Sequence, residues 1–194
     1  MNASLAGSGA LTTPHPARLT VGDFLLLSSS GAFDRYAKTE LINGAVTVVN
    51  AQFSEHLTAK IDLLLLLNEA CNRLGTGMRV WSEGSVALAE DSMPEPDLFI
   101  TTVRPTTGAV RPETIVLIVE VADTSLRTDL GEKAILYAVH GIAEYWVLDL
   151  PGRAIHQLWR PQANGYSERR VVKLGERVEA VTIAGLGVST EELA

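Results

Sequence analysis

The strongest constraint in this sequence is an unbroken apolar run that contains a single acid. Residues Ile115 to Ala122 read Ile-Val-Leu-Ile-Val-Glu-Val-Ala, so an extended strand would be apolar on both of its faces. Such a strand must be covered on both sides, which predicts a central position in a sheet. Glu120 then lies where a lone carboxylate is costly unless it is paired or bound to a metal. The run therefore predicts both the centre of a sheet and a candidate site.

Length, charge and cysteine content narrow the class of protein. The chain has 194 residues, which fits a poorly ordered segment over 1–19 and one domain over 20–194. Its formal net charge of −7 gives no global attraction to DNA or anionic membranes, so any nucleic-acid contact must be a local patch. Cys71 is the single cysteine, and no apolar stretch approaches the roughly 20 residues of a membrane span. We therefore expect a cytoplasmic protein without a membrane anchor.

Local patterns predict helices on a mixed sheet. Thr20 caps a short helix, Asn43-Gly44 is the favoured turn of a hairpin over 38–50, and helical spacing predicts helices over 54–74 and 129–139. The predicted strands after the first hairpin cover 78–81, 85–89, 97–101, 115–122, 144–150, 154–159, 166–173 and 178–183, with turns at Pro161, Asn164-Gly165 and Gly175-Glu176. The fold class is therefore α/β or α+β, a mixed sheet flanked by helices, with an N-terminal hairpin and C-terminal antiparallel strands.

Asp97 and Lys133 are the other residues whose setting suggests chemistry. Asp97 follows the rigid Pro94-Glu95-Pro96 segment and opens a strand, although a turn cap is the simpler explanation when this residue is taken alone. Lys133 lies on the flank of an apolar helix stripe, yet a surface pair with Asp129 one turn earlier is the simpler interpretation. Glu120 itself could instead emerge at the strand end and meet Arg127 or water.

Carboxylates combined with a lysine are what metal-assisted phosphodiester hydrolysis requires. Oxygen ligands hold Mg²⁺, the cation polarises the phosphate and acidifies a water molecule, and an ammonium group offsets the developing charge. Glu40, on a strand beside a turn, and His56, near a helix start, carry little weight by themselves. The residue types fit this chemistry, while their convergence in space does not follow from the sequence.

A longer string identifies a family. Residues 119–133, Val-Glu-Val-Ala-Asp-Thr-Ser-Leu-Arg-Thr-Asp-Leu-Gly-Glu-Lys, closely resemble the Uma-two family of restriction-endonuclease-like proteins. Further matches follow the family's order and extend the resemblance over about residues 20–190: Glu40-Leu41-Ile42-Asn43-Gly44, His56, Pro96-Asp97, Tyr137, Gly141-Ile142 and Glu144 to Asp149. The family is similar to the PD-(D/E)XK nuclease superfamily, whose core is a mixed sheet between helices with a metal site at its open end.

The resemblance implies a role for four of these residues. It implies Asp97 and Glu120 as ligands of Mg²⁺ or another divalent cation, Glu40 as a further acidic residue of the catalytic site, and His56 as an auxiliary polar residue of the same pocket.

One position departs from the superfamily pattern. A lysine is expected two residues after the second acid, and Ala122 stands there instead. The resemblance suggests Lys133 as the displaced catalytic lysine. Asp123 and Asp129 rank below Asp97 and Glu120, as outer partners or surface acids.

Three functions remain open from the sequence. The first is a Mg²⁺-dependent DNA endonuclease, acting as a two-fold homodimer, with candidate DNA contacts at Arg104, Arg111 and Arg127. The second is a catalytically silent module for nucleic-acid binding or self-assembly, in which Tyr145 and Trp146 could form an interface, although core packing is the simpler interpretation. The third is a metal-independent hydrolase in which Glu120, with a raised pKa, is the acid and Asp97 is the base or nucleophile.

Overall fold

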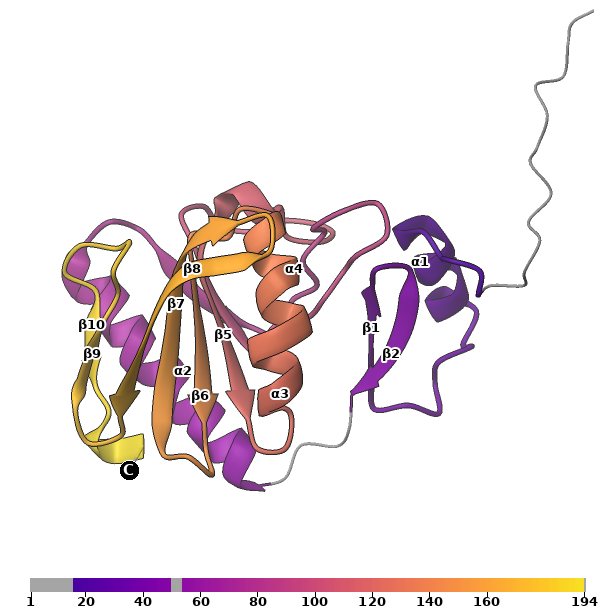
Figure 1. Ribbon diagram of the computed structural model, residues 1–194. Coiled ribbons are helices and arrows are strands. Elements are labelled where there is room, and N and C mark those ends of the chain that lie inside the picture. Colours follow the sequence, from indigo (N-terminus) through magenta and orange to yellow (C-terminus); the bar gives the residue numbers. More distant parts are fainter. Residues whose placement is uncertain (1–15, 50–53, 194) are drawn as a thin grey trace, which may run out of the picture.

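The apolar run forms strand β5 (Ile115–Ala122) in the middle of a six-stranded sheet (Figure 1). The computed structural model describes residues 16–49 and 54–193; the predicted N-terminal segment falls mostly on residues 1–15, outside the described residues. The strand order is β3-β4-β5-β6-β7-β8, with β5 and β6 parallel and every other neighbouring pair antiparallel. The other strands are β3 (Arg79–Ser82), β4 (Leu98–Thr101), β6 (Glu144–Asp149), β7 (Ala154–Gln162) and β8 (Gly165–Lys173). The predicted fold class is confirmed.

Successive side chains of β5 enter two separate hydrophobic cores. Val119 packs in the core that contains the buried leucines of helix α2 (Ser54–Leu74), whose bounds agree with the predicted helix. Ile118 lies in the opposite core together with Tyr137. Because side chains alternate along a strand, Glu120 points to this second face as well. The acid is therefore covered by the helix that follows β5 rather than by α2.

That helix contains a wide turn where the spacing predicts a regular helix over 129–139. Helix α3 (Leu126–Thr128) continues into a π-helical turn over Asp129–Lys133 and then into α4 (Ala134–Val139). The N–H of Ala134 donates to the carbonyl of Asp129, five residues earlier. Such single π turns insert one residue into a helix and occur often at functional sites. This one contains Lys133.

The N-terminal hairpin has the predicted turn. Strands β1 (Lys38–Ile42) and β2 (Ala45–Val49) pair in antiparallel fashion. Asn43 and Gly44 join them with φ angles of 48° and 75°, values that Asn and Gly tolerate best. Helix α1 (Val21–Ser29) precedes the hairpin and begins at Thr20, whose side chain caps it as expected.

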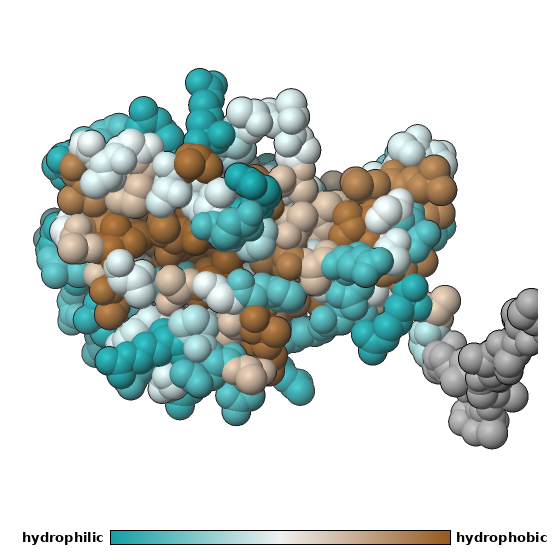
Figure 2. Space-filling model, turned by 90° about the horizontal axis from the view of Figure 1, so that it is seen from above, coloured by the Kyte–Doolittle hydropathy of each residue, from teal (hydrophilic) through white to brown (hydrophobic). Residues whose placement is uncertain are grey.

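This helix and hairpin form a unit beside the main sheet (Figure 1). Leu41 and Met93 exchange two backbone hydrogen bonds of 3.4 and 2.7 Å and form a small apolar cluster with Phe24. Figure 2 shows hydrophobic atoms on the outer surface of the unit. The exposed apolar residues of α1 are Leu25, Leu26 and Leu27. The unit is thus joined, through Leu41, to the segment between β3 and β4, and Leu41 is the neighbour of Glu40.

Two predictions in the loops are wrong. Residues 85–89 contribute only isolated bridges, because the chain turns back at Glu90-Asp91 and pairs Ala89 with Ser92. Pro161 lies within β7 rather than at a turn. A proline cannot donate a backbone hydrogen bond to a neighbouring strand. Pro161 is tolerated because β6 pairs with β7 only as far as Trp159, so no hydrogen bond to β6 is lost.

The last predicted strand is shorter than expected and has a different partner. In place of one strand over 178–183, β9 (Arg177–Glu179) pairs with β10 (Gly187–Ser189), a strand that the sequence pattern did not indicate. Short 3₁₀ turns cover Pro112–Thr114 and Glu191–Leu193. In the described ranges, 16–49 and 54–193, every helix is too short or too polar to cross a bilayer.

We expect Gly44→Ala to destabilise the protein more than Gly75→Ala. Both glycines have positive φ angles, 75° and 65°, so either alanine costs about 1 kcal/mol in the left-handed region. A Cβ atom on Gly44 would also lie 2.7 Å from the Cβ of Arg18, whereas one on Gly75 meets no atom within 4 Å. The free energy of unfolding in urea measures the difference, and equal losses would contradict the contact.

Candidate functional site

Asp97 and Glu120 are held together by the pairing of two strands. Leu98 of β4 lies opposite Val119 of β5, which sets the two acids side by side at the next position. The N–H of Asp97 donates to Oε2 of Glu120 at 3.2 Å, and the N–H of Val121 donates to Oδ2 of Asp97 at 2.9 Å. Their exposed fractions are 5% and 3%. The two carboxylates thus form one buried, hydrogen-bonded pair.

Lys133 joins this pair to the N-terminal hairpin. Its Nζ donates to Oε1 of Glu120 at 2.9 Å and lies 3.4 Å from Oε2 of Glu40. The other oxygen of Glu40 accepts the N–H of Glu95 at 2.9 Å. The surface pair of Lys133 with Asp129 is not the arrangement found, because the Asp129 side chain is buried and accepts the Ser125 hydroxyl.

His56 reaches the site from the start of α2. Its Nε2 lies 3.3 Å from Oδ2 of Asp97, and the ring is buried. Its Nδ1 is also buried and has no hydrogen-bond partner among the residues that the structure describes. The structure therefore brings together Glu40, His56, Asp97, Glu120 and Lys133, the five residues singled out from the sequence, while their chemical roles stay predictions.

Two residues of the site were missed by sequence reasoning. The hydroxyl of Tyr137 donates to Oε1 of Glu120 at 2.7 Å, and Nζ of Lys60 lies 4.0 Å from Oδ1 of Asp97. Each stands four positions after a residue already singled out, Lys133 and His56 respectively. Helix periodicity places such residues on the same face, so the signal was available in the spacing.

Burial and hydrogen bonding push the pKa values of the two acids in opposite directions. Burial alone would raise the pKa of Asp97, but hydrogen bonds from His56 and from the N–H of Val121 outweigh it and lower this pKa to about 2. Burial raises the pKa of Glu120 to about 8; Lys133 opposes this shift, while the charges of Asp97, Asp129 and Glu40 add to it. Burial would lower the pKa of Lys133, yet Glu120 and Glu40 raise it above its usual value. The site therefore contains more negative charge than Lys133 balances.

The donor set fits a hard divalent cation. Mg²⁺ commonly binds through one or two carboxylates, with water and substrate oxygens completing its shell. The interlocked pair of Asp97 and Glu120 offers those oxygens, and the surplus negative charge around Glu120 favours a cation. Among the described residues, no group of three or more His, Cys, Asp or Glu side chains is arranged to hold a metal. The geometry thus fits a two-carboxylate site completed by substrate, rather than a closed protein cage.

The three arginines that were candidates for DNA contacts are not part of this cluster. Arg104, Arg111 and Arg127 are exposed, and Arg111 lies 3.6 Å from Glu113. Arg127 is therefore not the partner of Glu120, whose Oε1 instead accepts hydrogen bonds from Lys133 and Tyr137.

Tyr145 and Trp146 are fully buried, which confirms core packing and leaves no basis for an interface there. The Tyr145 hydroxyl donates to the carbonyl of Asp129, and the Trp146 indole donates to Glu144.

A further buried acid lies outside this cluster and anchors a loop. Glu144 is completely buried at the start of β6. It accepts hydrogen bonds from Trp146 Nε1 at 2.6 Å, from the N–H of Val181 and from both the N–H and the hydroxyl of Thr182. These donors satisfy the carboxylate, which ties the C-terminal loop to the sheet.

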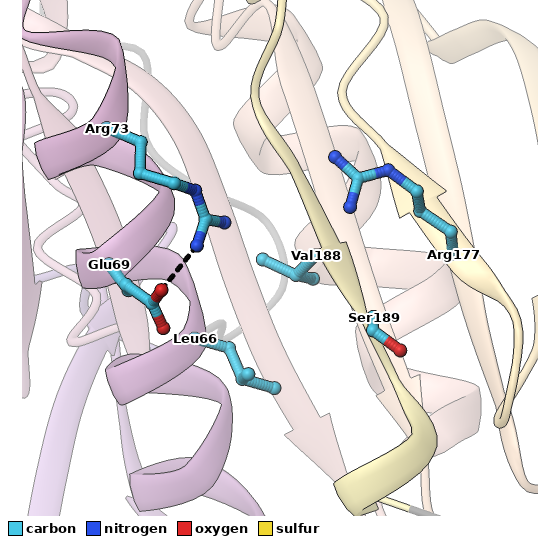
Figure 3. Close-up of a pocket in the computed structure, with 6 residues that line it drawn as sticks. All are labelled: Leu66, Glu69, Arg73, Arg177, Val188 and Ser189. Carbon is cyan, nitrogen blue, oxygen red and sulfur yellow. Dashed lines mark hydrogen bonds and ion pairs between the residues drawn. The ribbon is translucent and has the colours of Figure 1, made fainter.

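A surface pocket on the other side of α2 is separate from this site (Figure 3). It is lined by Leu66, Glu69, Arg73, Arg177, Val188 and Ser189. Both of its arginines already have carboxylate partners, since Arg73 pairs with Glu69 and Arg177 with Glu179. The pocket therefore adds nothing to the chemistry of the buried acids.

Comparison with known proteins agrees with the fold. The chain is similar to a crystal structure described as a "putative nuclease belonging to DUF820" from Anabaena variabilis, with a TM-score of 0.66 and 16% identity over 90% of this chain and 97% of that chain. The fold is thus similar to that of this structure, with one acid of the present chain, Glu120, on the central strand and Asp97 directly before the neighbouring strand. A family model, Uma2, described as "Putative restriction endonuclease", matches residues 22–191, and the chain belongs to this family. Among curated proteins no sequence matches it significantly.

We expect Asp97→Asn to lower the free energy of unfolding by about 2 kcal/mol at pH 7. The pKa of Asp97 is about 2 in the folded protein against 3.8 in the unfolded chain, so ionised Asp97 stabilises the fold above pH 3.8. This contribution is lost as the pH falls through about 2, so the difference between wild type and variant narrows below pH 4. Urea denaturation between pH 3 and 7 tests this. Glu132→Gln, which removes an exposed acid beside Lys133, is the control and should change little.

Proposed function

We propose that this protein is a divalent-cation-dependent DNA endonuclease that hydrolyses phosphodiester bonds. The observation that carries the proposal is the convergence of Glu40, Asp97, Glu120 and Lys133, which come from four separate segments of the chain, in one buried cluster. Membership of the family, together with the similarity of the fold, supports a nuclease role in general.

Each residue has a distinct task in this proposal. Asp97 and Glu120 would hold Mg²⁺, with Glu40 as a further acid beside them. When bound, the cation supplies Lewis acidity, which polarises a phosphate and makes a water molecule a stronger acid. The Lys133 ammonium stabilises negative charge that develops on the phosphate oxygens. His56 fixes Asp97 in its ionised form through the 3.3 Å contact.

Tyr137 orients Glu120 rather than reacting. Its hydroxyl is fully buried, and burial raises its pKa well above the usual value. It therefore keeps its proton and donates it in a hydrogen bond to Oε1 of Glu120. Oε2 accepts a longer bond, 3.2 Å from the N–H of Asp97, and is therefore the oxygen better placed to bind a cation.

Removing any of the three central groups should reduce DNA cleavage at least about 100-fold. The variants are Asp97→Asn, Glu120→Gln and Lys133→Met, assayed on supercoiled and branched DNA with Mg²⁺ and with EDTA. Glu120→Gln preserves the shape of the side chain, so we expect it to fold and to lose the thermal stabilisation that Mg²⁺ gives the wild type. Glu132→Gln should cleave like the wild type. Cleavage that persists in EDTA would contradict the dependence on a cation.

Contacts with DNA outside the cluster are also proposed. Arg104 and Arg111 lie in the loop between β4 and β5, and Arg127 lies in α3; all three are exposed and able to meet phosphates. A two-fold homodimer would let two such sites act on both strands of a duplex. Sedimentation of the protein with and without DNA tests the assembly, and substituting the arginines tests the contacts.

A second candidate function is supported by the opposite pKa shifts. Glu120, with a pKa of about 8, and Asp97, with a pKa of about 2, form an acid and a base held side by side. Such a pair is what a metal-independent hydrolase uses. Hydrolysis that continues in EDTA and is lost in Glu120→Gln would favour this function over the endonuclease.

A further inference from the structure

Lys60 is a second buried lysine beside the paired acids, and the reaction proposed above does not use it. It lies on α2, one helical turn after His56, and its side chain is 6% exposed. Its Nζ lies 4.0 Å from Oδ1 of Asp97 and donates to Oε1 of Glu83 at 2.5 Å. Lys133 approaches from the opposite face of the sheet. The pair of acids is thus flanked by one ammonium group from each face.

The partner of Lys60 differs from the other acids of the site. The side chain of Glu83 is 52% exposed, while those of Asp97 and Glu120 are buried. Glu83 also has a φ angle of 56°, a strained value for a residue with a side chain, directly after β3. The hydrogen bond from Lys60 lowers the pKa of Glu83, so this carboxylate is ionised at neutral pH. The exposed carboxylate of Glu83 therefore covers the buried ammonium group of Lys60.

A third lysine acts on the same carboxylates. Lys38 stands two residues before Glu40 on β1, so both side chains leave the strand on one face. Its Nζ donates to the carbonyl of Glu95 at 2.7 Å, and its charge lowers the pKa values of Asp97 and Glu83. Lys38 and Lys60 therefore add positive charge on the Asp97 side of the site, although the whole chain has a net charge of −7.

We infer that Lys60 binds a backbone phosphate of the DNA next to the bond that is cleaved, and that Glu83 occupies this phosphate position until DNA displaces it. The inference rests on the proposed function. A phosphate oxygen can replace a half-exposed carboxylate without burying a new charge, since Lys60 remains paired throughout. Both carboxylates that Lys133 contacts are buried, whereas Lys60 has a half-exposed partner in Glu83, so Lys60 is the lysine whose partner can be exchanged. Lys60 is thus a phosphate-binding residue, distinct from the group that offsets charge on the reacting phosphate.

The test is the salt dependence of DNA binding. Binding of a short duplex is measured in EDTA, so that no cleavage intervenes, at several salt concentrations. Each phosphate contact contributes about 0.9 to the slope of log K against log salt, so Lys60→Met should reduce that slope by about 0.9 for B-DNA. Lys60→Arg keeps the charge and should restore the slope. In Mg²⁺, Lys60→Met should raise KM more than it lowers kcat, because the contact exists before the reaction.

Two further variants serve as matched controls. Lys173→Met removes an exposed lysine on β8, three strands away from β5, and should leave the slope near that of the wild type. Glu83→Gln removes the exposed carboxylate that competes with the DNA phosphate for Lys60. It should tighten DNA binding and retain the wild-type slope of log K against log salt. Because this substitution leaves the buried lysine in place, it tests the exchange even where Lys60→Met does not fold.

The outcomes separate this inference from the function on which it rests. If wild type binds and cleaves DNA while Lys60→Met keeps the full slope and KM, the inference is overturned and the endonuclease stands. Weaker binding by Glu83→Gln would also overturn the exchange. If wild type neither binds nor cleaves DNA, the proposed function fails, and the phosphate site fails with it.

Discussion

The ammonium group of Lys133 balances carboxylates that arrive from two distant parts of the chain. Glu120 lies on a central, largely buried strand of the sheet, and Glu40 lies on a hairpin outside it. Neither acid is accessible to water, so their charges must be compensated within the protein. Lys133 contacts both, and its helix is packed where it can do so. The position of the hairpin and the burial of the site are therefore linked through one side chain.

Elements with a strong local pattern were predictable from the sequence. The apolar run 115–122, the leucine-rich helix 54–74 and the Asn43-Gly44 hairpin all have the expected bounds, because each pattern depends on residues close in sequence. The π turn over 129–133 was not predictable, since the pattern of the helix does not show one inserted residue. The short strand β10 was missed for a similar reason, because its pairing with β9 depends on a distant segment.

Some residues of the candidate site could likewise be predicted from the local sequence, and others could not. Glu120 was identified from the residues alone, because an acid inside a covered strand demands a partner. Glu144 shows the weakness of that argument, since it is equally buried and serves only to anchor a loop. Glu40 and His56 have ordinary local sequences, and only the resemblance pointed to them. Ala122 is fully buried in the second core, and the ammonium group beside Glu120 comes instead from Lys133 on the following helix.

The way in which the hairpin is attached has a consequence for dynamics. Proteins open in local units well below the free energy of global unfolding, and units with few buried contacts open first. The N-terminal unit rests on a small apolar cluster around Leu41, whereas the six-stranded sheet has two large cores of its own. Transient detachment of the unit would remove one acid from Lys133 while the central strands kept their hydrogen exchange protection. The free energy of opening this unit, rather than that of unfolding the six-stranded sheet, would then set how much of the time Glu40 stays beside Lys133.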